Sequence, residues 1–240
     1  MVPLEHRQRI IVALDVNTRR QALDWVQRLR GRVGMFKIGS QLFTAEGPSL
    51  VREIIALQEQ VFLDLKFHDI PNTVSKSVLV AADLGVLMLT LHTSGGQKMM
   101  HSAVESLAQR GTKPVPILLG VTLLTSLSDS EIREVGFLES SENQVARLAR
   151  LAEAAGLDGI VASPLELASL RRQVGRQFKI VTPGIRPADS ATDDQQRMAT
   201  PEAAVAGGAD YLVIGRPILS APDPVAALEQ IVSRLSAVEN

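Results

Sequence analysis

The chain has 240 residues, of which 45% are hydrophobic and 21% charged, with a formal net charge of −1. The length suits one (β/α)8 barrel, and the near-neutral charge without a basic run argues against a nucleic-acid-binding groove. Because the sequence contains no cysteine, disulfides, zinc–thiolate sites, iron–sulfur clusters and a cysteine nucleophile are excluded.

The N-terminal residues 1–9 are charged and lead directly into the first predicted strand. They lack the apolar segment and cleavage site of a signal peptide. No apolar run approaches the roughly 18 residues that a membrane span requires. We therefore expect a cytoplasmic protein that binds neither membranes nor nucleic acids.

Eight short aliphatic runs are predicted to be strands, and most are continuously apolar, as in a parallel sheet that is covered on both faces. Stretches with the helical spacing of apolar residues separate them. The predicted strands are residues 10–16, 35–40, 61–67, 86–92, 115–124, 159–162, 179–183 and 211–215.

Eight strand–helix units predict the α/β class and a single (β/α)8 barrel, the TIM-barrel architecture, over residues 1–240. A doubly wound open sheet is the alternative. Such sheets usually have about five to seven strands and a glycine-rich first turn. The first strand here ends in Ala-Leu-Asp15-Val-Asn, and no such glycine motif follows it, which favours the barrel.

Four charged residues stand at the ends of the first three strands, where barrel active sites lie. Asp64 and Lys66 are two residues apart and share one face of their strand. If that face is the lumen, Asp15 and Lys37 of the neighbouring strands converge on them. These charges either form a structural salt-bridge network or line a functional cleft, and their clustering at strand ends favours the cleft.

Arginines and glycines follow the last two strands, at the loops that commonly bind phosphate in this fold. Arg186 follows the seventh strand, Gly215 ends the eighth, and Arg216 comes directly after it. The alternative for the eighth is only a tight strand exit. The polar segment 187–200 is either a surface connection or a lid, and we favour a lid from which Gln195 reaches the phosphate.

The segment 64–73, DLKFHDIPNT, resembles the signature of the orotidine 5′-phosphate decarboxylase family. The resemblance covers nearly the whole chain, including Ala-Leu-Asp15, Phe-Lys37-Ile-Gly, Thr-Pro183-Gly-Ile-Arg186 and Ile-Gly215-Arg216-Pro. It implies decarboxylation of orotidine 5′-monophosphate to UMP and carbon dioxide in de novo pyrimidine biosynthesis, without a metal or other cofactor.

The resemblance also implies a role for each site residue. Lys66 would donate a proton to C6 of the pyrimidine, within an array of Lys37, Asp64, Lys66 and Asp69. Asp69, Ile70 and Thr73 would enter the partner's site in a homodimer with interfacial active sites, while His68 receives no chemical role. His92, at the end of the fourth strand, either lines the mouth or packs behind it, and we favour packing. The implied substrate contacts are Asp15 and Lys37 for the ribose, Thr125 and Pro183 for the base, and Arg186, Gln195, Gly215 and Arg216 for the phosphate.

Two other functions fit parts of the pattern. A magnesium-dependent phosphosugar lyase of the same barrel superfamily would share an Asp-x-Lys-x-x-Asp core but require an additional acidic ligand. A non-catalytic nucleotide-binding barrel would bind UMP without turnover. Activity that survives a chelator separates the decarboxylase from the first alternative, and turnover itself separates it from the second.

Overall fold

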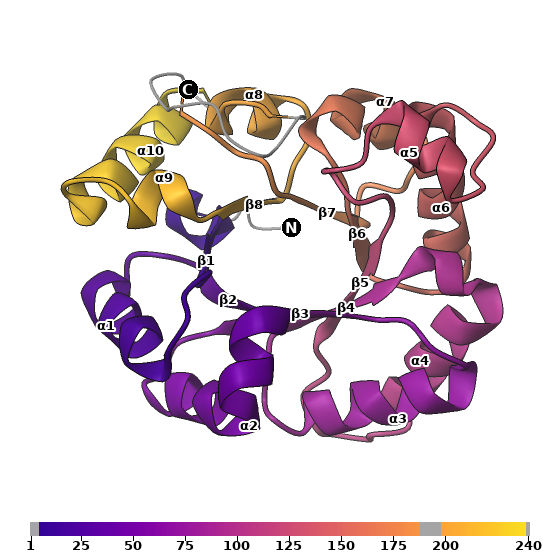
Figure 1. The fold of residues 1–240 in the computed structure, drawn as a ribbon, viewed down its shortest axis with the longest axis horizontal. Coiled ribbons are helices and arrows are strands. Elements are labelled where there is room, and N and C mark those ends of the chain that lie inside the picture. The colour runs from indigo at the N-terminus through magenta and orange to yellow at the C-terminus, as the bar shows by residue number, and fades with distance from the viewer. Residues whose placement is uncertain (1–4, 188–197, 239–240) are drawn as a thin grey trace.

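Eight parallel strands close into a barrel in this computed structural model, which describes residues 5–187 and 198–238. Each strand pairs with its neighbours in sequence order, and β1 pairs with β8 to complete the ring. Figure 1 looks into the barrel and shows the helices arranged around it. The (β/α)8 barrel expected from the sequence is therefore confirmed.

The strands alternate with helices along the chain. The strands are β1 (Ile10–Ala13), β2 (Met35–Gly39), β3 (Val61–Phe67), β4 (Met88–His92), β5 (Ile117–Val121), β6 (Gly159–Val161), β7 (Lys179–Thr182) and β8 (Tyr211–Ile214). The α-helices are α1 (Arg19–Leu29), α2 (Ser40–Ala56), α3 (Pro71–Ala82), α4 (Gln97–Ala108), α5 (Asp129–Glu134), α6 (Ser141–Ala154), α7 (Leu167–Arg171), α8 (Pro201–Ala206), α9 (Arg216–Leu219) and α10 (Pro224–Val238). Three short 3-10 helices are η1 (His6–Arg9), η2 (Thr93–Gly95) and η3 (Pro164–Glu166).

All eight predicted strands are present, although several are shorter than predicted at their C-terminal ends. β1 stops at Ala13 instead of residue 16, and β5 stops at Val121 instead of residue 124. The apolar runs continue beyond the last ladder hydrogen bonds into loops that line a pocket. Apolar composition marks burial rather than backbone pairing, so it overestimates strand length at the mouth of a barrel.

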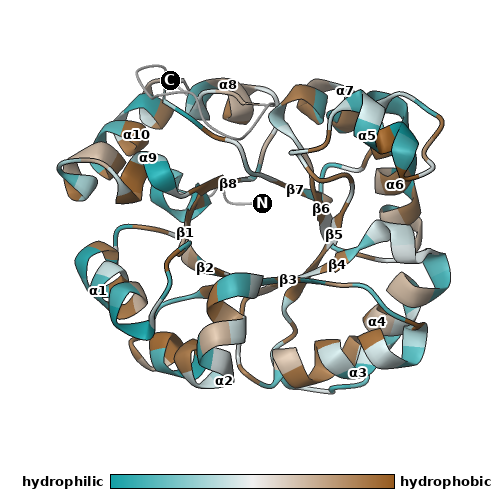
Figure 2. Ribbon diagram, viewed as in Figure 1, coloured by the Kyte–Doolittle hydropathy of each residue, from teal (hydrophilic) through white to brown (hydrophobic). Residues whose placement is uncertain are grey.

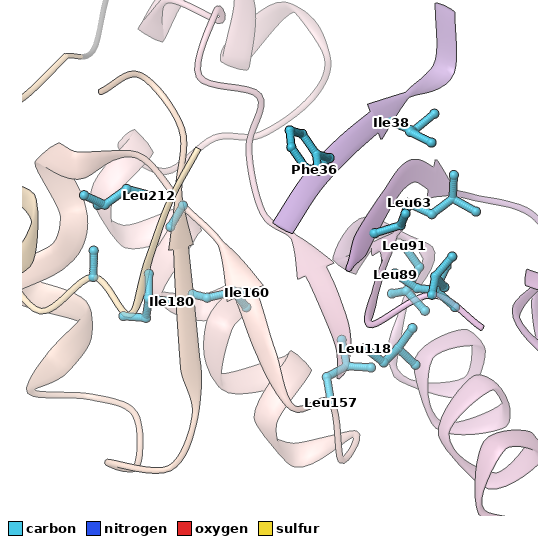
Figure 3. Close-up of a cluster of buried hydrophobic side chains, with 14 of the residues drawn as sticks. Phe36, Ile38, Leu63, Leu89, Leu91, Leu118, Leu157, Ile160, Ile180 and Leu212 are labelled. Atoms are coloured by element: carbon cyan, nitrogen blue, oxygen red, sulfur yellow. The ribbon is translucent and has the colours of Figure 1, made fainter. Parts of the chain in front are cut away.

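The larger apolar core lies between the strands and the helices. Figure 3 shows some of its side chains, including Phe36, Leu63 and Leu89, which are buried between the barrel strands and the surrounding helices. Figure 2 shows apolar and polar residues alternating along the surrounding helices. Across the described ranges, no helix is both long enough and apolar enough to span a bilayer.

A smaller cluster fills the barrel lumen with inward-facing side chains, among them Met35, Phe62 and Met88. Side chains alternate between the two faces of a strand, so residues two positions further along also point inward. Those next inward positions carry Lys37 on β2 and Asp64 on β3. The strand period thus places charged groups above the apolar lumen cluster, at the C-terminal mouth of the barrel.

Candidate active site

A pocket opens at the C-terminal ends of the strands, where the sequence predicts the site. Within its lining, cationic side chains outnumber carboxylates four to two, which favours an anionic ligand. Nine of the predicted site residues line it: Asp15, Lys37, Asp64, Lys66, Thr125, Pro183, Arg186, Gly215 and Arg216.

Asp64 is the best-buried charge of the pocket and is held at both carboxylate oxygens. Its Oδ2 lies 2.8 Å from Nζ of Lys66 and 3.8 Å from Nζ of Lys37. Its Oδ1 accepts a hydrogen bond of 2.9 Å from the hydroxyl of Thr90. A buried carboxylate is costly unless it is paired and hydrogen-bonded, and here two ammonium groups and a hydroxyl meet that need.

Lys37 links this centre to the first strand. Its Nζ lies 3.3 Å from Oδ1 of Asp15, and its side chain is only 12% exposed, whereas that of Asp15 is 63% exposed. The four predicted charges therefore form one continuous chain of contacts, from Asp15 at the solvent edge to Lys66 over the lumen. The geometry brings together the residues that the strand pattern predicted to converge.

Lys66 has an unusual backbone for a residue in a strand. Its φ is +53°, in the left-handed region that non-glycine residues rarely adopt. The pairing of β3 with β4 shifts register there, so that Leu63 faces Leu89 but Phe67 faces Leu91. Such conformations cost about 1–3 kcal/mol and persist where surrounding contacts over-determine them, which is often at functional sites.

His92, at the end of β4, lies beside His68, with the two ring centroids 5.4 Å apart. Burial lowers the pKa of His92, and the nearby His68 and the charge of Lys66 lower it further. Because the pKa falls below its ordinary value near 6.5, the imidazole is neutral at physiological pH. Neither histidine lines the pocket.

Another part of the pocket wall is formed by the ends of β7, which lies across the ring from β3, and of β8, which pairs with β1. The backbone N–H of Arg186 donates to the carbonyl of Ala199 at 2.9 Å, which holds the strand exit in place. A Cβ at Gly215 would lie 3.4 Å from Asp15 Oδ2, so the backbone passes close to that carboxylate. Arg216 follows directly and also lines the pocket.

Three predicted residues lie outside the pocket of their own chain. Asp69, Ile70 and Thr73 sit in the loop after β3 and at the start of α3, all exposed. The carboxylate of Asp69 accepts a 2.6 Å hydrogen bond from the N–H of Ile70, whose apolar side chain is 65% exposed. Gln195 falls outside the described residues, so neither it nor the predicted lid is placed.

The sequence analysis missed two parts of the site. One is Thr90, which contacts both Asp64 and the backbone of Lys66. Its inward position could have been found, because it lies two residues after the lumen residue Met88. The other is the apolar wall contributed by Val121, Leu123, Leu124, Val161 and Val213. Over the described part of the chain, no three His, Asp or Glu side chains gather where they could hold a metal ion.

The fold and site define a (β/α)8-barrel enzyme whose charged mouth is built from strand ends. A model of the family described as "Orotidine 5′-phosphate decarboxylase / HUMPS family" matches residues 8–231. The chain belongs to this family.

Relatives agree with this assignment over nearly their full lengths. The chain is 52% identical to an orotidine 5′-phosphate decarboxylase of Syntrophotalea carbinolica, covering 98% of this chain and 97% of that protein. It is 53% identical to one of Laribacter hongkongensis, covering 95% and 93%. A crystal structure of orotidine 5′-phosphate decarboxylase from Lactobacillus acidophilus superposes with a TM-score of 0.84 at 38% identity, covering 94% of this chain and 98% of that one.

Proposed function

We propose that this protein converts orotidine 5′-monophosphate to UMP and carbon dioxide in de novo pyrimidine biosynthesis, without a metal or organic cofactor. The observation that carries the proposal is the presence of two separate pairs of cationic side chains in the lining of one pocket. Lys37 and Lys66 stand on the neighbouring strands β2 and β3, and Arg186 and Arg216 follow the neighbouring strands β7 and β8. Orotidine 5′-monophosphate carries two separate anionic groups, a ring carboxylate and a phosphate, that match this arrangement.

The chemistry requires positive charge at the reacting carbon. When the bond between C6 and the carboxylate breaks, its electron pair remains on C6 in the plane of the ring, where the π system cannot delocalise it. A preorganised ammonium group stabilises that developing charge. Lys66, held by Asp64 at 2.8 Å, would then transfer one proton to C6 and recover it from solvent, as a general acid does.

The phosphate-binding wall would supply binding energy away from the reacting bond. Arg186, Gly215, Arg216 and Gln195 would hold the phosphate, and this energy would offset the desolvation and ordering of the reacting groups. At the centre of the pocket, Asp15 and Lys37 would bind the ribose hydroxyls. Two further residues, Thr125 and Pro183, would border the pyrimidine.

The proposed enzyme is a homodimer whose active sites are completed across the interface. Asp69, Ile70 and Thr73 lie outside their own pocket, and the large apolar side chain of Ile70 faces solvent in the single chain. Both observations support a role in the partner's site. There Asp69 would complete the alternating array begun by Lys37, Asp64 and Lys66.

Mixing two inactive variants tests this sharing of sites. Lys66→Ala and Asp69→Ala proteins, unfolded and refolded together, form heterodimers in which one site carries both substitutions and the other carries neither. In a two-fold dimer with random pairing, about one site in four should be intact, restoring about a quarter of wild-type activity. Mixtures as inactive as the separate variants would show that Asp69 does not act across subunits.

The decisive assay follows the absorbance of orotidine 5′-monophosphate, with and without EDTA. Turnover that is unchanged by the chelator is the expected result. Turnover that is lost in EDTA and restored by magnesium would favour the metal-dependent chemistry of a phosphosugar lyase. The name of the matched family also includes HUMPS, so this alternative is tested directly. Binding of UMP without any turnover would indicate a non-catalytic nucleotide-binding barrel.

A further inference from the structure

We propose that Thr90 is a positioning residue that fixes both the backbone and the ammonium group of Lys66 through one hydroxyl. The inference rests on the proposed role of Lys66 as proton donor. Thr90 does not line the pocket, so it would act through Lys66 and Asp64 rather than by touching the substrate. Its side chain is fully buried in the barrel.

The first observation is that the irregularity next to Thr90 belongs to β3 alone. From Leu63 to Phe67, β3 advances four residues, while its partner advances only two, from Leu89 to Leu91. On its other side β4 pairs regularly with β5, residue by residue from Met88 to His92. The additional residues of β3 include Lys66 with its left-handed backbone, whose N–H is displaced from the regular ladder.

The second observation is that the Thr90 hydroxyl replaces the lost ladder partner. The N–H of Lys66 donates to Oγ1 of Thr90 at 2.9 Å, and the same hydroxyl donates to Oδ1 of Asp64 at 2.9 Å. The direction of both bonds is fixed, because a backbone N–H only donates and a carboxylate only accepts. An unpaired N–H at this partly buried position would cost free energy, so the hydroxyl supports the left-handed conformation.

Together these contacts form a closed ring. It runs from the Lys66 backbone through Thr90 to one oxygen of Asp64, and returns from the other oxygen to the Lys66 ammonium at 2.8 Å. Thr90 therefore constrains both ends of the same lysine, and it orients the carboxylate between them. Arg186 and Arg216, which are proposed to bind the phosphate, are not members of this ring.

The test compares Thr90→Val with two matched proteins. Valine keeps the β-branched shape and removes only the hydroxyl. Thr93→Val makes the same change at another fully buried threonine, whose hydroxyl donates to the carbonyl of Val121 at 2.9 Å and contacts neither Asp64 nor Lys66. Thr90→Ser keeps the hydroxyl and removes a methyl group. For each we would measure kcat, KM, UMP affinity and Tm.

We expect Thr90→Val to lower kcat by about 100-fold, because small displacements of a reacting group are that costly. UMP affinity should stay within about twofold of wild type, Thr90→Ser should retain most of kcat, and Thr93→Val should match wild-type kinetics. Equal kcat for Thr90→Val and Thr93→Val would overturn the inference. So would a Thr90→Ser protein as impaired as Thr90→Val, since shape rather than hydrogen bonding would then matter.

Two further arms keep the result interpretable. If Thr90→Val does not fold, Thr90→Ser and Thr90→Ala make the comparison instead, because both lose the methyl group and only alanine loses the hydroxyl. Equal kcat for that pair would contradict the inference. Lys66→Ala separates the two hypotheses: an active Lys66→Ala protein refutes the proposed function of Lys66, whereas an inactive one beside an active Thr90→Val protein refutes only the positioning role.

Discussion

Two charged clusters of similar composition occupy opposite ends of the barrel. Each consists of one carboxylate between two cations, and burial does not distinguish them, because the Asp64 side chain is 12% exposed and that of Asp210 is 17% exposed. The mouth cluster is Asp64 with Lys37 and Lys66, and the floor cluster is Asp210 with Arg171 and Lys179.

The clusters differ in what their donors contact. In the floor cluster, Arg171 pairs with Asp210 and also donates to the carbonyls of Gly208 and Phe178, both at 2.7 Å. The carboxylate of Asp210 accepts the N–H of Ile180 at 2.8 Å. These bonds join α7 to the starts of β7 and β8, so the floor cluster stabilises the packing of these elements.

In the mouth cluster, the ammonium groups of Lys37 and Lys66 contact carboxylates and border an open pocket. The Lys66 side chain keeps 34% of its surface exposed and rests on a strained backbone. Charge composition and burial therefore do not distinguish the proposed functional cluster from the structural one. The two clusters differ in what surrounds their cations: Arg171 donates to backbone carbonyls, whereas Lys37 and Lys66 border the pocket.

The largest expected effect comes from Lys66→Ala. Removing the proposed proton donor should lower kcat by at least about 1,000-fold, the scale of lost acid catalysis and lost electrostatic stabilisation. UMP affinity should change little, and Tm should fall only slightly, because Asp64 keeps Lys37 and the Thr90 hydroxyl as partners. Steady-state kinetics, calorimetric titration and thermal melting check the three expectations; a near-normal kcat would remove Lys66 from the mechanism.

The converse substitution, Arg171→Ala, should act on stability alone. It leaves Asp210 partly buried without its guanidinium partner and frees two backbone carbonyls. We expect unfolding free energy to fall by about 2–3 kcal/mol and Tm by about 5–10 °C, with unchanged kcat at a temperature where the protein is folded. Arg172→Ala, at the exposed neighbouring residue, is the control. A lower kcat in folded Arg171→Ala protein would break the division between the two clusters.

Arg216→Ala tests whether the part of the pocket that follows β8 acts on substrate binding. Loss of a charge-assisted contact to phosphate should lower kcat/KM by about 10- to 100-fold. If Arg216 holds the phosphate, nucleosides that lack the phosphate should be turned over equally by the variant and by wild type. The same Arg172→Ala protein is the control, and equal losses with both substrates would argue against a phosphate contact.

The smallest effect concerns pH and His92. Burial, His68 and the charge of Lys66 lower its pKa in the folded state, so at acidic pH the unfolded chain binds a proton that the folded protein does not. Stability then rises with pH, and it is lost as the pH falls below the pKa of histidine in the unfolded chain, about 6.5. His92→Gln should flatten the fall of Tm between about pH 7 and pH 5.

The control for this measurement is His101→Gln. His101 is exposed on α4 and lies 3.4 Å from Glu105. This variant should keep the wild-type dependence of Tm on pH. If His92→Gln and wild type lose stability in parallel on acidification, the lowered pKa of His92 does not contribute to acid sensitivity.

Much of the fold and the site follows from local sequence patterns. Each strand is an aliphatic run between helical segments, and the strand period places Asp64 and Lys66 on one shared face of their strand. The loops after β7 and β8 carry Arg186 and Arg216 in the positions expected of this fold. Those inferences succeed because burial and alternation are encoded within a few consecutive residues.

Other features depend on contacts that no single segment encodes. Lysine has no preference for a left-handed backbone, so the conformation of Lys66 arises only when β3 meets β4 and the hydroxyl of Thr90. The lengths of β1 and β5 depend on where neighbouring ladders end. The proposed positions of Asp69 and Thr73 beside a partner's site depend on a second chain, which the sequence predicts only through family resemblance.

The hydrogen-bonded ring around Lys66 has a consequence for protein design. An Asp-x-Lys segment transplanted into another parallel barrel would bring the two charges but would keep the lysine in a regular strand. The transferable unit is the adjacent pair of strands, with the two extra residues of β3 and the threonine of β4 moved together. Substitutions within that unit should also be non-additive. Libraries that vary these positions one at a time would therefore miss functional combinations.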